Sequence, residues 1–234
     1  MSANATTSPG VLISFEGGEG VGKSTHIRLL AARIEASGRQ VLMLREPGGS
    51  RIGEKIRAFL LDLENTDIDA LAELLLYEAA RAQLVAEQIA PALASGRVVL
   101  LDRFIDSTLA YQGYGRGLPL PLVRQANAIG SRGLTPDRTI VFVSDVQGSL
   151  AKAQAAGADR LESEGLDFHE RVTQGFIELA KAEPERICLI APDEDKRTTA
   201  AEVAAAVVGL LPGLPLDFQL SDQLIKSAKR AQTR

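Results

Sequence analysis

The sequence predicts an α/β fold in which a five-stranded parallel sheet is flanked by helices on both faces. Short apolar runs alternate with longer segments of helical periodicity along most of the chain, an order typical of parallel sheets with helical connections. The runs are aliphatic throughout, as expected for strands covered on both faces. Of the 234 residues, 45% are apolar and 24% are charged, a composition that can fill the core of one compact domain.

Five apolar runs are the predicted strands: "VLISF" at 11–15, "QVLMLR" at 40–45, "RVVLLD" at 97–102, "RTIVFVSD" at 138–145 and "RICLIA" at 186–191. Helical periodicity predicts helices over 22–37, 50–62, 67–94, 104–114, 119–131, 147–156, 167–182 and 196–209. We expect residues 11–211 to form the folded domain. A flexible tail over 1–10 and a polar, basic tail over 212–234 would flank it.

The composition argues against several classes of function. The net charge is −4, so neither nucleic acid nor an anionic membrane is an expected partner. Cys188 is the only cysteine, which excludes an intrachain disulfide, and no other metal ligands accompany His26 or His169, so no zinc site is predicted. The chain shows neither a leader sequence nor an apolar run of about 18 residues, and we expect a soluble, cytoplasmic protein.

The stretch "GGEGVGKST" at 17–25 carries the strongest chemical signal. Gly17, Gly22, Lys23 and Ser24 have the spacing of a phosphate-binding loop, and the stretch lies between a predicted strand and a predicted helix, as that loop requires. Glycines let backbone N–H groups turn toward a phosphate, and the start of the helix adds a favourable dipole. Lys23 would reach the β- and γ-phosphates of a nucleoside triphosphate, and the Ser24 hydroxyl would bind Mg²⁺.

Asp102 and Arg103 follow the third predicted strand and provide the second signal. An aspartate at the end of a buried strand, beside a phosphate-binding loop, is suited to hold the water shell of Mg²⁺. Arg103 would stand at the carboxyl edge of the sheet, where α/β proteins bind their ligands. The alternative interpretation is an ordinary helix-capping aspartate followed by a surface arginine.

Three classes of protein commonly use a phosphate-binding loop. A guanine-specific switch normally carries Asn-Lys-x-Asp, which this chain lacks, and a motor or transporter ATPase usually brings further domains. A small-molecule kinase is therefore favoured, acting on a nucleotide or another small acceptor. An ATPase or a regulatory nucleotide-binding module without a phosphoryl acceptor is the alternative from a different class.

Motifs in order along the chain resemble those of the bacterial thymidylate kinases: "FEGGEGVGKST", "REPGGSRIGEKIR", "LLLYEAARAQLV", "DRFIDSTLAYQGYGRG" and "DRLESEGLDFHERV". The resemblance extends from about Val11 to about Val208. It implies a P-loop nucleoside monophosphate kinase fold with a five-stranded parallel sheet and a short lid at about 147–166. It further implies transfer of the γ-phosphate of ATP to dTMP, giving dTDP and ADP for dTTP synthesis, with Mg²⁺ as cofactor and in a homodimer.

The same resemblance implies how the ATP side is divided among residues. Lys23, Arg103 and Arg160 would offset the charge of the transferring phosphoryl group, and Ser24 and Asp102 would hold Mg²⁺. ATP would be bound by Gly17, Gly18, Glu19, Gly20, Val21, Gly22, Lys23, Ser24 and Thr25.

The resemblance also implies a dTMP site assembled from several segments. Its residues would be Glu19 near the sugar, Glu46 and Pro47 on the phosphate side, Arg57 and Arg103 at the phosphates, Tyr77 stacked on thymine, Arg81 at O4, Thr108 and Gln112 at N3 and the base edge, and Tyr111 under the deoxyribose.

Helical spacing is consistent with two of these groups. Tyr77 and Arg81 are four residues apart and share one helix face, as do Thr108, Tyr111 and Gln112. Without the resemblance, Tyr77 would be interpreted as core packing, and Arg81 equally well as one partner of a surface ion pair.

The lid segment departs from the family pattern. Relatives without a basic residue inside the phosphate-binding loop usually carry several lid cations. Here the segment reads "AKAQAAGADRLESEGL" at 151–166, with Lys152 and Arg160 as its basic residues. We therefore expect Arg160 to supply most of the positive charge of the lid.

Overall fold

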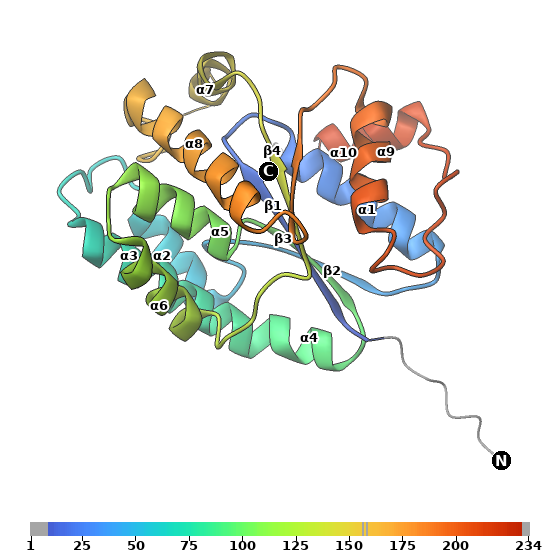
Figure 1. Ribbon diagram of the computed structural model, residues 1–234, viewed down its shortest axis with the longest axis horizontal. Helices are drawn as coiled ribbons and strands as arrows, with labels where there is room; N and C mark the ends of the chain where they lie inside the picture. The colour runs from blue at the N-terminus through green and yellow to red at the C-terminus, as the bar shows by residue number, and fades with distance from the viewer. Residues whose placement is uncertain (1–8, 156, 158, 231–234) are drawn as a thin grey trace.

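The computed structural model describes residues 9–155, 157 and 159–230 (Figure 1). Most of the predicted N-terminal tail, residues 1–8, lies outside this part. Five parallel strands form one sheet in the order β2-β3-β1-β4-β5. The strands are β1 (Val11–Gly17), β2 (Val41–Arg45), β3 (Val98–Asp102), β4 (Arg138–Phe142) and β5 (Ile187–Ile190). The predicted α/β fold with a five-stranded parallel sheet is confirmed.

Helices cover both faces of this sheet (Figure 1). One face carries α1 (Lys23–Ala36) and α9 (Lys196–Val207). The other face carries α3 (Ala70–Leu84), the π-helical η1 (Val85–Ile89), α4 (Ala90–Ala94), α5 (Ile105–Thr108), the π-helical η2 (Leu109–Gly115) and α8 (Leu166–Ala182). Two helices, α2 (Arg51–Leu61) and α6 (Leu120–Gly130), pack against α3, and α7 (Val146–Ala155) occupies the predicted lid.

Successive residues of the central strand β1 are buried on both faces of the sheet. Ile13 and Phe15 are fully buried in the core toward α1 and α9. Leu12 points the other way, into a core that includes Leu84 of α3. Because both faces of β1 are covered by helices, neither set of side chains meets water. The polar residues Ser14 and Glu16, on the same side as Leu12, are therefore also buried and make hydrogen bonds.

Several helices begin at a residue whose side chain caps the helix. The Ser50 hydroxyl accepts a hydrogen bond from the N–H of Gly53 at the start of α2, and the Asp69 carboxylate accepts from that of Leu71 at the start of α3. By contrast, α1 follows Gly22, which has a left-handed φ of 96°, and in the described part of the chain no side chain caps it. Its first N–H groups can therefore serve an anion.

The segment 212–230, predicted to be part of a polar, basic tail, packs against the rest of the chain. It contains a helix, α10 (Asp222–Arg230), that packs against α1. Leu220 and Ile225 are buried there with Leu29 of α1. The Arg28 guanidinium, also from α1, donates to the carbonyl oxygen of Ala228 at 2.8 Å. Residues 231–234 lie outside the described part of the chain.

The longest predicted helix, 67–94, is a single helical rod with a wider π-helical turn, η1, between α3 and α4. A second π-helical stretch, η2, continues α5 and carries Tyr111 and Gln112. None of the helices in the described ranges is both long enough and apolar enough to cross a membrane.

Candidate active site

The glycine-rich loop joins the end of β1 to the start of α1. A Cβ atom on Gly17 would lie 2.3 Å from the carbonyl oxygen of Phe142, and its φ of 119° is unfavourable for other residues, so only glycine fits. Lys23 is buried, and its ammonium donates to the carbonyl oxygen of Gly18 at 2.6 Å and more weakly to that of Gly17. Burial lowers the pKa of this ammonium. The lysine thus lies over the loop that is predicted to bind phosphates.

Ser24 and Asp102 meet beside this loop, as the sequence predicts for a Mg²⁺ site. The Ser24 hydroxyl donates to a carboxylate oxygen of Asp102 at 2.8 Å. A hydroxyl and a carboxylate are hard oxygen ligands, and Mg²⁺ is usually held by one or two such side chains together with phosphates and water. The pair therefore fits a Mg²⁺ ion that accompanies a nucleotide.

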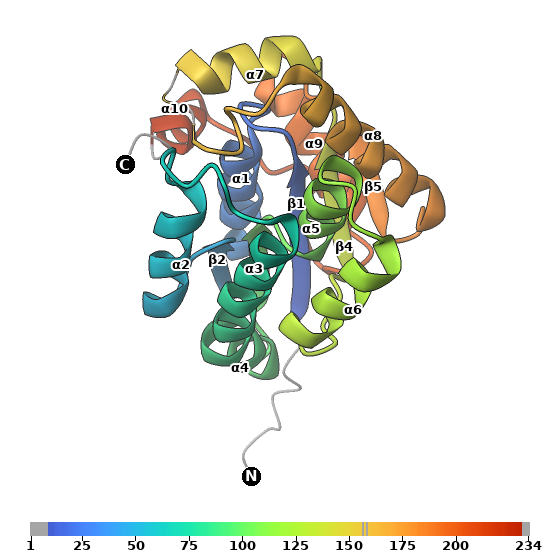
Figure 2. The same ribbon diagram turned by 90° about the vertical axis from the view of Figure 1, so that its left-hand side faces the viewer.

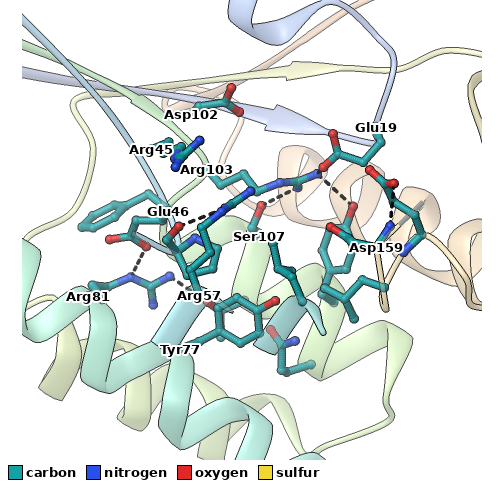
Figure 3. A pocket seen from close by; sticks show the side chains of 18 of the residues that line it. Glu19, Arg45, Glu46, Arg57, Tyr77, Arg81, Asp102, Arg103, Ser107 and Asp159 are labelled. Atoms are coloured by element: carbon teal, nitrogen blue, oxygen red, sulfur yellow. Dashed lines mark hydrogen bonds and ion pairs between the residues drawn. The ribbon is translucent and has the colours of Figure 1, made fainter. Parts of the chain in front are cut away.

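A cavity of about 300 Å³ opens next to the loop (Figure 3). In Figure 3, Glu19 and Asp102 lie on its sheet side, and Tyr77 and Arg81 lie on its helix side. Every residue that the sequence assigns to dTMP lines this cavity: Glu19, Glu46, Pro47, Arg57, Tyr77, Arg81, Arg103, Thr108, Tyr111 and Gln112. Segments from five parts of the chain are thereby brought together.

Arg103 lines the cavity. Its backbone adopts a left-handed φ of 72°. Its guanidinium donates to the hydroxyls of Ser107 at 3.0 Å and Tyr111 at 3.2 Å, and it pairs with Glu19. It also lies 4.9 Å from the centre of the Tyr111 ring. Burial alone would raise the pKa of the Glu19 carboxyl, but Arg103 and Lys23 outweigh burial and hold that pKa at about 2.

Glu16, which the sequence analysis did not single out, supports the turn that carries Arg103. Its fully buried carboxyl accepts hydrogen bonds from the N–H of Phe104 at 2.9 Å and from the Ser107 hydroxyl. Burial and the neighbouring Asp106 raise the pKa of Glu16 to about 8. The residue stands within "FEGG", next to the loop, but only the fold shows that it reaches the turn after β3.

Arg81 is buried rather than a surface residue, with 2% of its side chain exposed. Its guanidinium donates to Glu46 at 2.8 Å, to Glu78 at 2.5 Å, to Asn127 at 2.7 Å and to the Thr108 hydroxyl at 2.9 Å. These described bonds use four of the five N–H groups of an arginine. An ion pair of Arg81 with Glu78 does form, but it is buried and not on the surface, so Arg81 is fixed at the cavity wall.

The phosphate side of the cavity is formed by the "REPGG" segment and α2. Arg57 donates to the carbonyl oxygen of Pro47 at 2.9 Å, and Arg45 pairs with Glu54 at 3.1 Å. Burial and the neighbouring Arg45 lower the pKa of Arg57. Two guanidinium groups thus line one end of the cavity, which would suit an anion.

Arg160 does not line the cavity, although a role at the transferring phosphoryl group would require it to face that cavity. It is buried, donates to the carbonyl oxygen of Leu60 at 2.7 Å and forms a 2.6 Å ion pair with Glu73. Its guanidinium ties the base of the lid to α2 and α3 instead of facing the glycine-rich loop. The side chain of Lys152, the other basic residue of the lid, lies outside the described part of the chain.

His169, for which the sequence predicts no zinc-binding role, lines both this cavity and a smaller one between the glycine-rich loop, α7 and α8. Its Nε2 atom is buried and has no hydrogen-bond partner among the described residues. Burial lowers its pKa. No sequence signal distinguishes this histidine from an ordinary helix residue.

Comparisons with known proteins agree with this geometry. A family model for thymidylate kinase matches residues 15–203. The thymidylate kinase of Desulforudis audaxviator is 45% identical over 207 residues, covering 88% of this chain and 94% of that protein. The thymidylate kinase of Deinococcus radiodurans is 47% identical over 201 residues, or 86% of this chain and 97% of its own.

Among solved structures, the crystal structure of thymidylate kinase from Ehrlichia chaffeensis is similar, with a TM-score of 0.69 at 33% identity, and the match covers 85% of this chain and 99% of that one. The region matched by the family model runs from the glycine-rich loop through the cavity and lid into α9. The chain belongs to the thymidylate kinase family.

Proposed function

We propose that this kinase transfers the γ-phosphate of ATP to dTMP, giving dTDP and ADP, in the cavity beside the glycine-rich loop. One observation carries the proposal. The phosphate-binding loop adjoins a cavity, and Glu19, Ser24 and Asp102 line it where the two meet. Arginines line one end of this cavity, and side chains that would read the base line the other. Such a cavity offers room for a second nucleotide next to the phosphates of the first.

The donor side of the reaction rests on Lys23 and the loop backbone. The ATP phosphates would bind over residues 17–25 and draw the Lys23 ammonium from the Gly18 carbonyl oxygen to the β- and γ-phosphates. Mg²⁺, held by Ser24 and Asp102, would supply further positive charge there when bound.

The transfer itself requires positioning and charge neutralisation rather than a covalent enzyme intermediate. A phosphate oxygen of dTMP attacks the γ-phosphorus, and the bond to the oxygen shared with the β-phosphate breaks. ADP keeps that oxygen and its electron pair. Arg103, centred between the two sides, would stabilise the transferring group, while Arg57 and Arg45 would hold the dTMP phosphate. No general base is needed, because the acceptor is already an anion.

The base and sugar of dTMP would lie between α3 and η2. Tyr77 would stack on the thymine ring, and the remaining N–H of Arg81 would donate to O4. Thr108 and Gln112 would bind the N3 side of the base. Tyr111 is held edge-on against Phe168, with ring centres 6.1 Å apart, so its fixed ring would lie against the deoxyribose.

A homodimer, in the cytoplasm, is part of the same proposal. Exposed apolar side chains gather on α2, α3 and α6, which lie side by side in Figure 2. They are Ile52, Phe59, Leu71, Leu75, Leu122 and Ile129, each at least 38% exposed. Exposed apolar side chains on three neighbouring helices would suit a second copy of the chain.

The proposed reaction is tested by ADP release from the wild-type protein and from Lys23→Ala, each with and without dTMP. The wild type should release ADP only when dTMP is present, and the variant should show no measurable turnover while keeping its circular dichroism spectrum. ADP release that does not depend on dTMP would instead indicate an ATPase. Near-normal turnover by a folded Lys23→Ala protein would overturn the role of the loop.

A further inference from the structure

A buried carboxylate on α3 lies directly behind the base-reading wall of the cavity. Glu73 is fully buried. Among the described residues, four hydrogen bonds reach it from three side chains: Gln112 at 2.9 Å, Arg116 at 3.2 and 3.1 Å, and Arg160 at 2.6 Å. None of the motif-based assignments includes Glu73, and it does not line the cavity. Its contacts nevertheless include a residue that does.

Two arginines keep Glu73 in its charged form. Burial alone would raise the pKa of this carboxyl, but the hydrogen bonds from Arg116 and Gln112 outweigh burial and lower that pKa. An ionised carboxylate can only accept hydrogen bonds. Whatever group faces Glu73 must therefore be a donor.

This requirement fixes the orientation of the Gln112 side chain. The amide nitrogen of Gln112 donates to Glu73, and the opposite orientation would place an amide oxygen against a carboxylate oxygen. Gln112 is almost fully buried and lines the cavity. With its NH₂ group held by Glu73, the amide presents its oxygen, a hydrogen-bond acceptor, to a bound base.

An acceptor at this place distinguishes one kind of pyrimidine from the other. Thymine and uracil have an N3–H donor next to an O4 acceptor, whereas cytosine has an N3 lone pair next to an amino donor. The Gln112 oxygen and the remaining N–H of Arg81, which both face the cavity, would complement the first pattern. Against cytosine, the lone pairs of Gln112 and N3 would face each other, and so would the remaining N–H of Arg81 and the amino group.

We infer that Glu73 is a positioning residue for base specificity: it locks the Gln112 amide so that the cavity accepts thymine and uracil and rejects cytosine. This inference rests on the proposed function, because it assumes that the base of the acceptor lies against Gln112. Glu73 itself does not touch the substrate.

In the variant Glu73→Gln, the side chain of Gln112 should no longer be held in one orientation. One oxygen of the carboxylate accepts from Arg160 and Arg116 together, and the other from Gln112 and one nitrogen of Arg116. The new NH₂ group would avoid the first position, where two guanidinium groups donate, and would take the second. It would then donate toward Gln112, whose amide must turn and present NH₂ to the base.

The experiment measures kcat/KM for dTMP, dUMP and dCMP with the wild type, Glu73→Gln and Glu164→Gln. dUMP and dCMP differ only at N3, which Gln112 reads, and at the neighbouring 4-position, which Arg81 reads. Glu164 pairs with the same Arg116 but makes no described bond to Gln112, so it is the matched control. In Glu73→Gln the dUMP to dCMP preference should fall roughly 10- to 100-fold, whereas the dTMP to dUMP preference and the control should change little.

An unchanged dUMP to dCMP preference in a folded Glu73→Gln protein would overturn the inference, and so would an equal loss in Glu164→Gln. A wild type without activity on dTMP would instead refute the proposed function.

A second measurement uses only the wild-type protein, so it does not depend on whether a variant folds. In ¹⁵N spectra of the wild type, the Gln112 amide proton that bonds to Glu73 should exchange slowly with water before dTMP is added. Protection that arises only on dTMP binding would mean that NH₂ faces the base, which contradicts the inference.

Discussion

The buried carboxyl of Glu16 helps to hold Arg103 in place. Its carboxyl holds the N–H of Phe104 and the hydroxyl of Ser107, which in turn accepts from Arg103. The charged groups that act on it are Asp106, Arg103 and Lys23. Burial and Asp106 raise the pKa of Glu16 to about 8 in the folded protein, from an ordinary value of 4.5. The folded state therefore binds more protons than the unfolded state between these two pH values.

This shift predicts that the wild type loses stability as pH rises, relative to Glu16→Gln. Below pH 4.5 both states carry the proton and the contribution is complete, and it is lost as pH rises toward 8. The slope is at most about 1.4 kcal/mol per pH unit. Urea unfolding of both proteins at pH 5 and pH 7.5 measures the difference. Parallel pH profiles would mean that Glu16 is not protonated in the folded state.

Arg160 should act on dTMP binding rather than on the transferring phosphoryl group, because its guanidinium is committed to Glu73 and the Leu60 carbonyl oxygen. In Arg160→Ala we expect KM for dTMP to rise about tenfold while kcat falls less. Steady-state kinetics with dTMP as the varied substrate measures both constants. A loss of about 10³ in kcat at unchanged KM would instead indicate an arginine that reaches the phosphates when the lid closes.

Residues that bind through a local motif could be predicted from the sequence, whereas those that act through the fold could not. Lys23 and Ser24 follow from the spacing of the loop alone. Arg81 was assigned to the base by resemblance, but its partner Asn127 lies 46 positions away and has no motif of its own. Glu16 and Glu73 were missed for the same reason: each acts on a cavity residue from a different element.

At the level of secondary structure, α10 is the clearest departure from expectation. Its segment is mostly polar, and the apolar residues Leu214, Leu220 and Ile225 are spaced too irregularly to predict a buried helix. They find their partners only because α1 leaves an apolar face on its outer side. The strands, by contrast, were predicted within about three residues, since buried parallel strands are uninterrupted aliphatic runs. The π-helical turns of η1 and η2 have no sequence signature that periodicity detects.

Removing residues 215–234 should therefore destabilise the protein. The deletion exposes Leu29 and discards the buried Leu220 and Ile225, and each fully buried side chain contributes about 1.5–3 kcal/mol. A fall in the melting temperature of about 10 °C or more is expected, measured by differential scanning calorimetry. Leu220→Ala should reproduce part of the fall, whereas Leu216→Ala, at a position 56% exposed in the same segment, should not. An unchanged melting temperature of the truncated protein would mean that α10 contributes little to folding.

At the scale of the whole molecule, α2, α3 and α6 lie side by side (Figure 2) and carry six exposed apolar side chains, where the proposed dimer would form. If two copies associate there, light scattering should give twice the chain mass of 24.9 kDa. Leu75→Asp places a charge on this surface at a position 57% exposed and should yield the single-chain mass. Leu216→Asp, nearly as exposed but on the C-terminal segment, should remain dimeric. A monomeric wild type would contradict the proposed dimer.

In the proposed enzyme one donor loop adjoins one acceptor cavity that selects thymine and deoxyribose, and the choice of acceptor tests this most directly. ADP release should be measured with ATP, Mg²⁺ and, in turn, dTMP, dUMP, UMP, dCMP and dGMP. We predict the highest kcat/KM for dTMP, a lower value for dUMP, and little turnover of UMP, dCMP or dGMP. A higher kcat/KM for any of the other four, or ADP release without an acceptor, would contradict the account.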